Sequence, residues 1–497
     1  MTQSRADELL VKSGLLTLAR IGQMGAQIFM GLVIPKLVSP TQYGLWRSLL
    51  LITQFSAFVN IGSYNTMGVK IPLYEGKGDA NEKERIKNNT FYYNIIGSTI
   101  LAVGLIMSTL FLDSEFNNFY KVGFFLFSGI TFFSNIADFY LQLSRAEKLF
   151  SLISKLTILQ ALINAIISGT LLFYFNEVLF LGAGMILSNI TVIFLESREL
   201  GLPKYSQVSF YKIIEIIKYG FPLLLSGLLF ELIRSLDQLF IVKYLNAEQM
   251  GYYGLAISIQ RIGFLVPGVL GSIMMPYIYE EFGRSNDIFK VSNFFDRGLR
   301  LISLLSAFLF AALYTQIHLL INYFLTQYIP ALPILNILIL GMFSLALLGL
   351  PEVLGAITGK IPTIIKWQLL IVLLAAILFY FVLQSGYGIQ EVALSSVSIY
   401  AIYVIGTLVI IYNTFCQNGL EIMRKIIILC FPYFYLMLCL FGIESYFPKL
   451  GNGFLDDFLS SALKLFILLF LYLPVIIYYD KKLKFLDVIM RKFKSFF

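Results

Sequence analysis

The chain has 497 residues, of which 58% are hydrophobic and only 13% are charged, and its net charge is +8. A soluble globular domain is typically about 25% charged, so this composition excludes a soluble protein and indicates a polytopic membrane protein. The positive residues cluster in short loops at one face of the membrane, which argues against nucleic acid as a partner.

Apolar runs of the length that crosses a bilayer, ~20 residues, follow one another along the whole chain. They are apolar on every side, whereas the strands of a membrane barrel alternate in polarity over ~10 residues. The sequence therefore predicts an all-α polytopic membrane protein with about fourteen spans. We expect these spans at 13–34, 43–68, 90–112, 121–143, 152–175, 178–196, 219–245, 251–282, 299–325, 330–357, 363–384, 389–415, 425–447 and 455–479.

The loops between these spans alternate sharply in charge. One set is rich in lysine and arginine, as in Lys83, Arg85 and Lys87, whereas the other holds little beyond isolated lysines such as Lys121. Because positive loops stay on the cytoplasmic side of a membrane, we expect the basic loops there. An even number of spans then places both termini in the cytoplasm.

A short sequence motif occurs once in each half of the chain. Ile34-Pro35-Lys36 followed by Gln42-Tyr43-Gly44 matches Ile241-Val242-Lys243 followed by Gln249-Met250-Gly251, with the same separation from lysine to glycine. Chance similarity of two short loops is the alternative. Halves related in this way are common in transporters, which bind their substrates near the midplane between the halves.

Four arginines lie inside predicted spans, where a charge costs several kcal/mol unless it meets a partner or water. Arg234 lies ~16 Å below Leu245 and Arg261 ~15 Å below Gly251, at ~1.5 Å per helical residue, so we expect both near mid-membrane. Arginine grips phosphate through a planar fork of donors. The pattern therefore predicts a cationic cavity near Arg234 and Arg261 for an anionic substrate.

Several carboxylates also lie within or near the predicted spans, and they could pair with the arginines or carry a coupling ion. Glu231 and Asp237 each lie three residues from Arg234, so they share a helical face with it, and a structural ion-pair ladder is one alternative to a cavity. For Arg47 the alternative is snorkelling to the membrane surface. A desolvated carboxylate can also carry H⁺ or Na⁺, which makes four residues candidates for ion coupling: Glu231, Asp237, Asp138 and Glu352.

Several kinds of site are missing from the sequence. It contains no Walker A motif and no catalytic triad, and its three cysteines and single histidine, His318, show no metal-ligand spacing. We therefore expect no catalytic residue, no metal and no cofactor. Transport would draw on an ion gradient or on the substrate gradient.

Short motifs resemble one family of membrane transporters. Leu37 to Pro40 with Tyr43-Gly44-Leu45 resembles the "L-S-P-x-x-Y-G-L" loop of bacterial polysaccharide exporters. Arg234, Asp237, Tyr244-Leu245 and Gly251-Tyr252-Tyr253 resemble the matching segment of the second half, and Gly355-Ala356 with Gly359-Lys360 is similar to a short "G-K" loop after span ten. The chain thus resembles Wzx-type O-antigen flippases of the multidrug/oligosaccharidyl-lipid/polysaccharide superfamily.

This resemblance implies two six-helix lobes around a central cavity. We expect the lobes at 1–200 and 201–415, with two further helices and a basic tail at 416–497. The resemblance also implies that the cavity is cationic, with substrate-binding residues at Arg20, Arg47, Arg234 and Arg261. It implies a bacterial inner-membrane protein that moves undecaprenyl-diphosphate-linked oligosaccharide to the outer leaflet, for O-antigen (part of lipopolysaccharide) or capsule. It also implies H⁺- or Na⁺-coupled antiport, and it suggests a polysaccharide polymerase and a chain-length regulator as partners.

Three alternatives remain open at this point. A lipid II flippase and a multidrug antiporter belong to the same superfamily, although midplane arginines suit cationic drugs poorly. A membrane polymerase or glycosyltransferase is the alternative from another class. Such enzymes carry large extramembrane loops, whereas no predicted external loop here exceeds about fifteen residues, so we expect a transporter rather than an enzyme.

Overall fold

The structure is a computed structural model that describes residues 30–111, 118–264, 287–446 and 453–483, together with Gly25 and scattered positions between 267 and 282. Within these ranges the regular structure is entirely helical. Eleven of the described helices are long and apolar enough to cross a membrane. The predicted all-α polytopic fold is therefore confirmed.

The chain divides into two compact units, Met1–Leu255 and Ala256–Phe497. The division falls within one helix, α9, and the lobe boundary expected at residue 200 stays a prediction. The helices of the first unit are α2 (Pro40–Ser56), α3 (Ser63–Lys77), α4 (Ala80–Phe111), α5 (Asn118–Ala146), α6 (Phe150–Phe175), α7 (Leu181–Leu200), α8 (Phe210–Tyr244) and the start of α9 (Ala247–Gly263).

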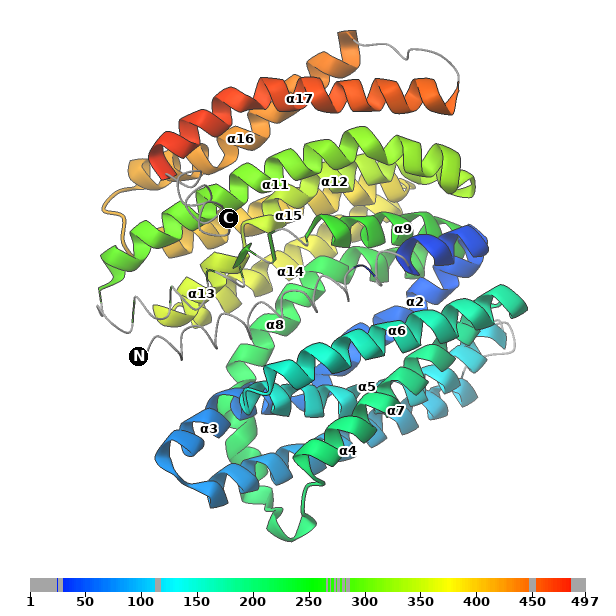
Figure 1. Cartoon of the computed structure of the whole chain (residues 1–497), viewed down its shortest axis with the longest axis vertical. Helices are drawn as coiled ribbons and strands as arrows, with labels where there is room; N and C mark the ends of the chain where they lie inside the picture. Colours follow the sequence, from blue (N-terminus) through cyan, green and yellow to red (C-terminus); the bar gives the residue numbers. More distant parts are fainter. Residues whose placement is uncertain are drawn as a thin grey trace, which may run out of the picture. The chain divides into compact units, whose positions relative to one another are not determined.

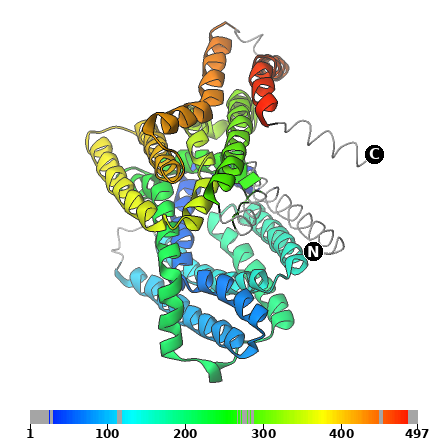
Figure 2. The ribbon, with the colours of Figure 1, turned by 90° about the vertical axis from the view of Figure 1, so that its left-hand side faces the viewer.

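The first unit packs α4, α5 and α7 side by side, and α6 lies against α7 (Figures 1 and 2). Its core toward the basic ends of these helices is built from fully buried apolar side chains of α3, α4, α5 and α8, including Met67, Ile86, Phe139 and Ile216. Asn176 closes the tight hairpin between α6 and α7 with a φ of 54°. Asparagine tolerates this left-handed conformation at the end of a helix.

The second predicted span, 43–68, is broken. It divides into α2, the short 3₁₀ turn Ala57–Asn60 and α3, and Ile61 and Gly62 adopt φ angles of 40° and 83° between them. The Asn60 side chain holds this break, because its amide donates to the Ala57 carbonyl and its Oδ1 accepts the Gly62 N–H at 2.9 Å. The sequence did not predict the break because the apolar run continues through it without a proline.

One face of α8 follows α2 and α3 along most of its length. Thr66 donates to the Ile216 carbonyl at 2.6 Å, Gly62 touches Gly220, and Gln54 donates to Glu231 further along. Steps of three and four residues keep positions on a single helical face. One face of α8 is therefore in contact with α2 and α3 along most of its length. Near its basic end the contacts are made by its backbone, and in its apolar half they are made by charged side chains.

The second unit contains α11 (Ile288–Phe324), α12 (Leu332–Ala346), α13 (Gly349–Ile357), α14 (Ile361–Gln384), α15 (Ile389–Tyr412), α16 (Gly419–Tyr446) and α17 (Phe454–Leu483). α12 packs between α11 and α15, while α16 and α17 pack on α11 (Figure 1). The span expected at 330–357 breaks at Leu347–Leu348 into α12 and α13. Pro351 contributes to this break because it has no N–H to donate to the Leu347 carbonyl.

The other predicted spans agree with the described helices to within a few residues at their apolar ends. Three helices begin well before the apolar run, at Ala80 in α4, Phe210 in α8 and Ile288 in α11, because charged residues continue the helix beyond the length that a bilayer covers. The span expected at 13–34 lies largely outside the described residues, and the span expected at 251–282 is described continuously only as far as Phe264, where it forms most of α9.

Candidate functional site

The two copies of the internal repeat begin their helices in the same way. Ser39 accepts the N–H of Gln42 at 3.3 Å, and Asn246 accepts the N–H of Gln249 at 2.8 Å. Each side chain is an N-cap that accepts a hydrogen bond from one backbone N–H group that has no partner within the first helical turn. The structure thus gives the two copies the same helix start in the same register.

The repeated glycines also touch each other's helices reciprocally. A Cβ on Gly44 would lie 1.7 Å from the Ala247 carbonyl oxygen, and one on Gly251 would lie 1.9 Å from the Pro40 carbonyl oxygen. Pro40 and Ala247 each precede their glycine by four residues. α2 and α9 therefore cross backbone to backbone, and only glycine allows this approach at the two equivalent positions.

Arg47 lies next to this crossing and is buried, with 6% of its surface exposed. Its Nη2 donates to Oε1 of Gln238 on α8 at 3.4 Å. A Cβ on Gly254 would come within 2.6 Å of Arg47 Cγ, so Gly254 leaves the space that the arginine stem occupies. Burial against two helices means that Arg47 does not snorkel to the surface, and that alternative is wrong.

Arg234 lies about one turn before Gln238 on α8, beside Glu231. Its Nη1 is 3.6 Å from Oε2 of Glu231, whose Oε1 accepts from Gln54 on α2. Its guanidinium carbon lies 5.6 Å from the ring centre of Phe230, within cation–π range. The Arg234 and Glu231 side chains keep 29% and 21% of their surface exposed, so the expected local pairing with Glu231 is present in a pair that still reaches the surface.

Asp237 is fully buried. Its Oδ2 accepts the Tyr253 hydroxyl of α9, and its Oδ1 accepts the N–H of Gln238 at 2.7 Å. A buried carboxylate is stabilised when donors surround it. Asp237 thus ties α8 to the start of α9, and its coupling role stays a prediction.

The remaining predicted residues lie elsewhere. Arg261 is exposed in the last turn of α9 and belongs to the second unit, so the depth that it would share with Arg234 stays a prediction. Glu352 is partly buried in the first turn of α13. Arg20 lies outside the described residues. The structure therefore brings together Arg47, Glu231, Arg234 and Asp237 but does not relate the other predicted residues to them.

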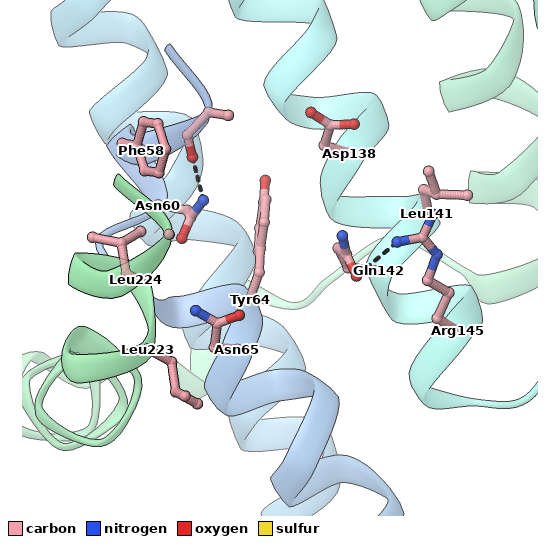
Figure 3. Close-up of a pocket in the computed structure, with 12 residues that line it drawn as sticks. Phe58, Asn60, Tyr64, Asn65, Asp138, Leu141, Gln142, Arg145, Leu223 and Leu224 are labelled. Atoms are coloured by element: carbon pink, nitrogen blue, oxygen red, sulfur yellow. Dashed lines mark hydrogen bonds between the residues drawn. The ribbon is translucent and has the colours of Figure 1, made fainter. Parts of the chain in front are cut away.

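Asp138 lines a separate cavity of about 390 Å³ in the first unit. Its walls come from the broken second span, from the basic end of α5 and from α8 (Figure 3). Tyr64 stands between the two sides and donates its hydroxyl to the Asn135 carbonyl at 2.6 Å. The other residues that line the cavity are Ala57, Phe58, Asn60, Asn65, Leu141, Gln142, Arg145, Leu223, Leu224 and Gly227.

Sequence reasoning missed the uncharged polar residues of both regions. Gln54, Gln238 and Tyr253 provide hydrogen bonds to the predicted charges, and Asn60 and Asn65 line the cavity. Amides inside apolar runs were the available signal, because a buried amide also needs hydrogen-bond partners.

Within the described ranges, no group of three or more His, Cys, Asp or Glu side chains could hold a metal ion.

The fold is similar to the folds of several solved structures. The chain is similar to the lipid II flippase MurJ in an inward closed conformation, with a TM-score of 0.68 and 16% identity over 93% of this chain and 99% of that one. It is also similar to a point mutant of the Vibrio cholerae MATE transporter VcmN, with a TM-score of 0.60 and 15% identity over 84% and 99% of the two chains. These similarities show that the chain shares the fold of these two proteins.

A family model described as "Polysaccharide biosynthesis protein" matches residues 33–333, which is more than half of the sequence, and the chain belongs to this family. A third similar structure is a transporter of the multidrug/oligosaccharidyl-lipid/polysaccharide superfamily from Pyrococcus furiosus, whose binding pocket has reversed polarity. The TM-score is 0.56, and the identity is 12% over 84% of this chain and 96% of that one. A search of curated proteins finds no significant match. The predicted resemblance to flippases of this superfamily is confirmed.

Proposed function

We propose that this protein is a flippase that moves undecaprenyl-diphosphate-linked oligosaccharide units from the cytoplasmic to the outer leaflet of the bacterial inner membrane. The single observation that carries the proposal is the cluster of Arg47, Glu231, Arg234 and Asp237 on α2 and α8. It lies inside apolar helices of a chain that belongs to a polysaccharide biosynthesis family. The product would enter O-antigen or capsule synthesis.

The partly exposed guanidinium of Arg234 in this cluster supports an anionic headgroup, because the Asp237 carboxylate is fully buried. Arg234 keeps almost a third of its side-chain surface exposed although it lies in an apolar span. A partly exposed guanidinium at that depth is stabilised by water or by an anion, and its fork of donors matches a diphosphate. Arg47 would add positive charge from α2, and Arg261 and Arg20 would extend the binding site.

The transport cycle would use alternating access coupled to H⁺ or Na⁺. Glu231, Asp237, Asp138 and Glu352 are the carboxylates that would carry the coupling ion. Both termini would face the cytoplasm, together with the basic loops. A polysaccharide polymerase and a chain-length regulator would act on the product, and the chain itself would catalyse no covalent step.

A lipid II flippase is the second candidate, because the fold is similar to MurJ over almost the entire length of both chains. A multidrug antiporter is a weaker candidate. The MATE-like fold is shared, but a cationic drug would be repelled by arginine at the depth where it binds.

Complementation separates these candidates. The full-length chain is expressed in cells that lack an oligosaccharide flippase, a lipid II flippase or a drug exporter, and surface polymer, viability or drug resistance is measured. We expect rescue of surface polymer alone. Rescue of drug resistance alone or viability alone would contradict the proposal and select the corresponding alternative.

Two variants of α8 test the anion site within the same assay. Arg234→Ala removes a charge-assisted contact that contributes ~1.5–3 kcal/mol, so transport should fall roughly 10- to 100-fold. Lys243→Ala removes the same charge from an exposed position in the last turn of α8 and is the matched control. Equal transport by both variants, at equal amounts in the membrane, would remove the anion site from the proposal.

A further inference from the structure

The cavity beside Asp138 is polar on two sides and lies within the first unit alone. Asn60, Tyr64 and Asn65 line it from the broken second span, and Asp138 and Gln142 line it from α5 (Figure 3). Its volume of about 390 Å³ falls within the range of small-molecule sites, ~300–1,000 Å³. A site of this size accommodates one or two sugar rings.

The groups that line this cavity suit hydroxyls better than ions. Asp138 and Arg145 balance each other in charge, so neither a diphosphate nor a cation meets a net opposite charge there. Amide side chains offer both donors and acceptors, and a carboxylate accepts two hydrogen bonds side by side. Neighbouring hydroxyls on a sugar ring present the complementary pattern, and the rings of Phe58 and Tyr64 offer apolar surface to its C–H face.

Some of these groups are already held in place, whereas others remain available. Asn60 is fixed by backbone contacts at the helix break, and Tyr64 is fixed by its hydrogen bond to Asn135. In the part of the chain that the structure describes, the side chains of Asp138 and Asn65 make no hydrogen bond or ion pair. A ligand hydroxyl would satisfy them without breaking a contact of the protein, and a preorganised wall reduces the entropy lost on binding.

The cavity lies along the same face of α8 as the charged cluster. Gly227 lines the cavity, Glu231 follows four residues later and Arg234 seven residues later. At ~1.5 Å per residue, Arg234 lies ~10 Å further along the helix axis. This spacing fits a molecule with a charged headgroup at one level and neutral rings, each ~5 Å long, at the next.

We propose that this cavity binds the sugars of the lipid-linked oligosaccharide, with hydroxyls on Asp138 and Asn65 and the diphosphate toward Arg234. This inference rests on the proposed function. It assigns an order to the substrate along α8, with its sugars toward the basic end of the helix and its diphosphate deeper in the apolar half.

Binding of two probes by the purified full-length protein tests the assignment. The first probe is farnesyl diphosphate, and the second is the tightest binder among farnesyl-diphosphate-linked disaccharides of neutral hexoses or N-acetylhexosamines. Asp138→Asn and Asn65→Ala should each weaken binding of the second probe roughly 3- to 10-fold, because each substitution removes one or two hydrogen bonds. Binding of farnesyl diphosphate should not change, and this also shows that the variants are folded.

Two controls complete the test. Asn118→Ala removes an exposed amide at the start of α5 and should leave both affinities unchanged. Arg234→Ala should weaken both probes. If Arg234→Ala weakens both probes but the cavity variants weaken neither, the sugar site is overturned while the flippase proposal stands. If Arg234→Ala weakens neither, the proposed function itself fails.

Two other results would also overturn the assignment. Equal weakening of both probes by Asp138→Asn would show that the residue acts on the diphosphate or on the fold. A change confined to the Na⁺ or H⁺ dependence of binding, with the sugar contribution intact, would identify Asp138 as a coupling residue instead.

Discussion

Gly62 and Gly220 bring the backbones of α3 and α8 into direct contact. A Cβ on Gly220 would lie 1.9 Å from the Gly62 carbonyl oxygen, and a Cβ on Gly62 would lie 2.4 Å from the Gly220 carbonyl carbon. Real Cβ atoms do not approach other atoms so closely. The contact therefore requires glycine at both positions, Gly62 just before α3 and Gly220 within α8, and it lies directly beside the break that shapes the polar cavity.

Gly220→Ala should destabilise the protein because the added methyl group has to push the two backbones apart. Overpacking of this kind costs about 1–3 kcal/mol, so the melting temperature in detergent should fall. Gly68→Ala on α3 is the matched control, since a Cβ there meets nothing within 4 Å. Alanine favours a helix over glycine, so this control should melt at the same temperature or higher, and a Gly220→Ala variant that behaved in the same way would contradict the close contact.

An ion-pair network fastens the same helices nearer to the start of α8. Lys70 Nζ lies 2.7 Å from Oε1 of Glu215, and Lys212 joins Glu215 at 3.0 Å and Glu82 of α4 at 2.7 Å. Lys70→Glu would place a carboxylate against Glu215. Partly exposed pairs contribute ~0.2–1 kcal/mol, so we expect a small loss of unfolding free energy that shrinks as salt is added.

The charge-swapped pair Lys70→Glu with Glu215→Lys distinguishes a direct interaction from a general effect of charge. It restores opposite charges between α3 and α8 while it brings the introduced lysine side chain close to Lys212. We expect the double variant to recover part of the stability lost by Lys70→Glu. Losses that simply add would show that the two residues do not interact in the folded protein.

The sequence predicted the spans because hydropathy depends on each helix alone. The eleven described spans follow the expected runs, and the four clustered residues Arg47, Glu231, Arg234 and Asp237 stood out as charges in apolar surroundings. The break at Ile61 was not predictable in this way. The break is accompanied by the contact of Gly62 with Gly220 of α8 and by the hydrogen bonds of the Asn60 side chain within the break, and hydropathy reports neither of them.

Partners of the predicted charges depend on helix packing and could not be derived from spacing. The i,i+3 rule offered pairing of Glu231 with Arg234 as one alternative, and the structure contains this ion pair. The same rule placed Asp237 on the same side. It gave no reason for Asp237 to meet Tyr253 of α9 or for Arg47 to meet Gln238. These contacts follow from the crossing of α2 and α9 at Gly44 and Gly251, which brings distant segments of the chain together.

Two adjacent tyrosines provide a matched test of buried and exposed hydrogen bonds. Tyr253 donates to Asp237, which is fully buried, whereas Tyr252 donates to Glu248 at 2.6 Å in an exposed pair. Tyr253→Phe removes a donor from a carboxylate that water does not reach. We expect a loss of about 1–3 kcal/mol of unfolding free energy.

Tyr252→Phe is the control, because water replaces the lost hydroxyl at the exposed carboxylate. Its unfolding free energy should change by less than about 0.5 kcal/mol. Chemical unfolding in detergent, followed by the fluorescence of Trp46 and Trp367, measures both variants. Equal losses at the two positions would show that the burial of Asp237 has no energetic consequence.

The substitutions discussed so far should destabilise the protein or leave it unchanged, whereas a substitution at Ile61 should stabilise it. Its φ of 40° is unfavourable for a β-branched side chain, and 38% of its surface is exposed, so only part of its apolar surface is packed against the protein. Asparagine tolerates this conformation, and strain of this type costs about 1–3 kcal/mol. Ile61→Asn should therefore raise the melting temperature by several degrees. Val69→Asn, at a position of α3 that is 46% exposed and has ordinary helical geometry, should not raise it. If Ile61→Asn melts no higher than Val69→Asn, the backbone at the break between α2 and α3 is not strained by its isoleucine.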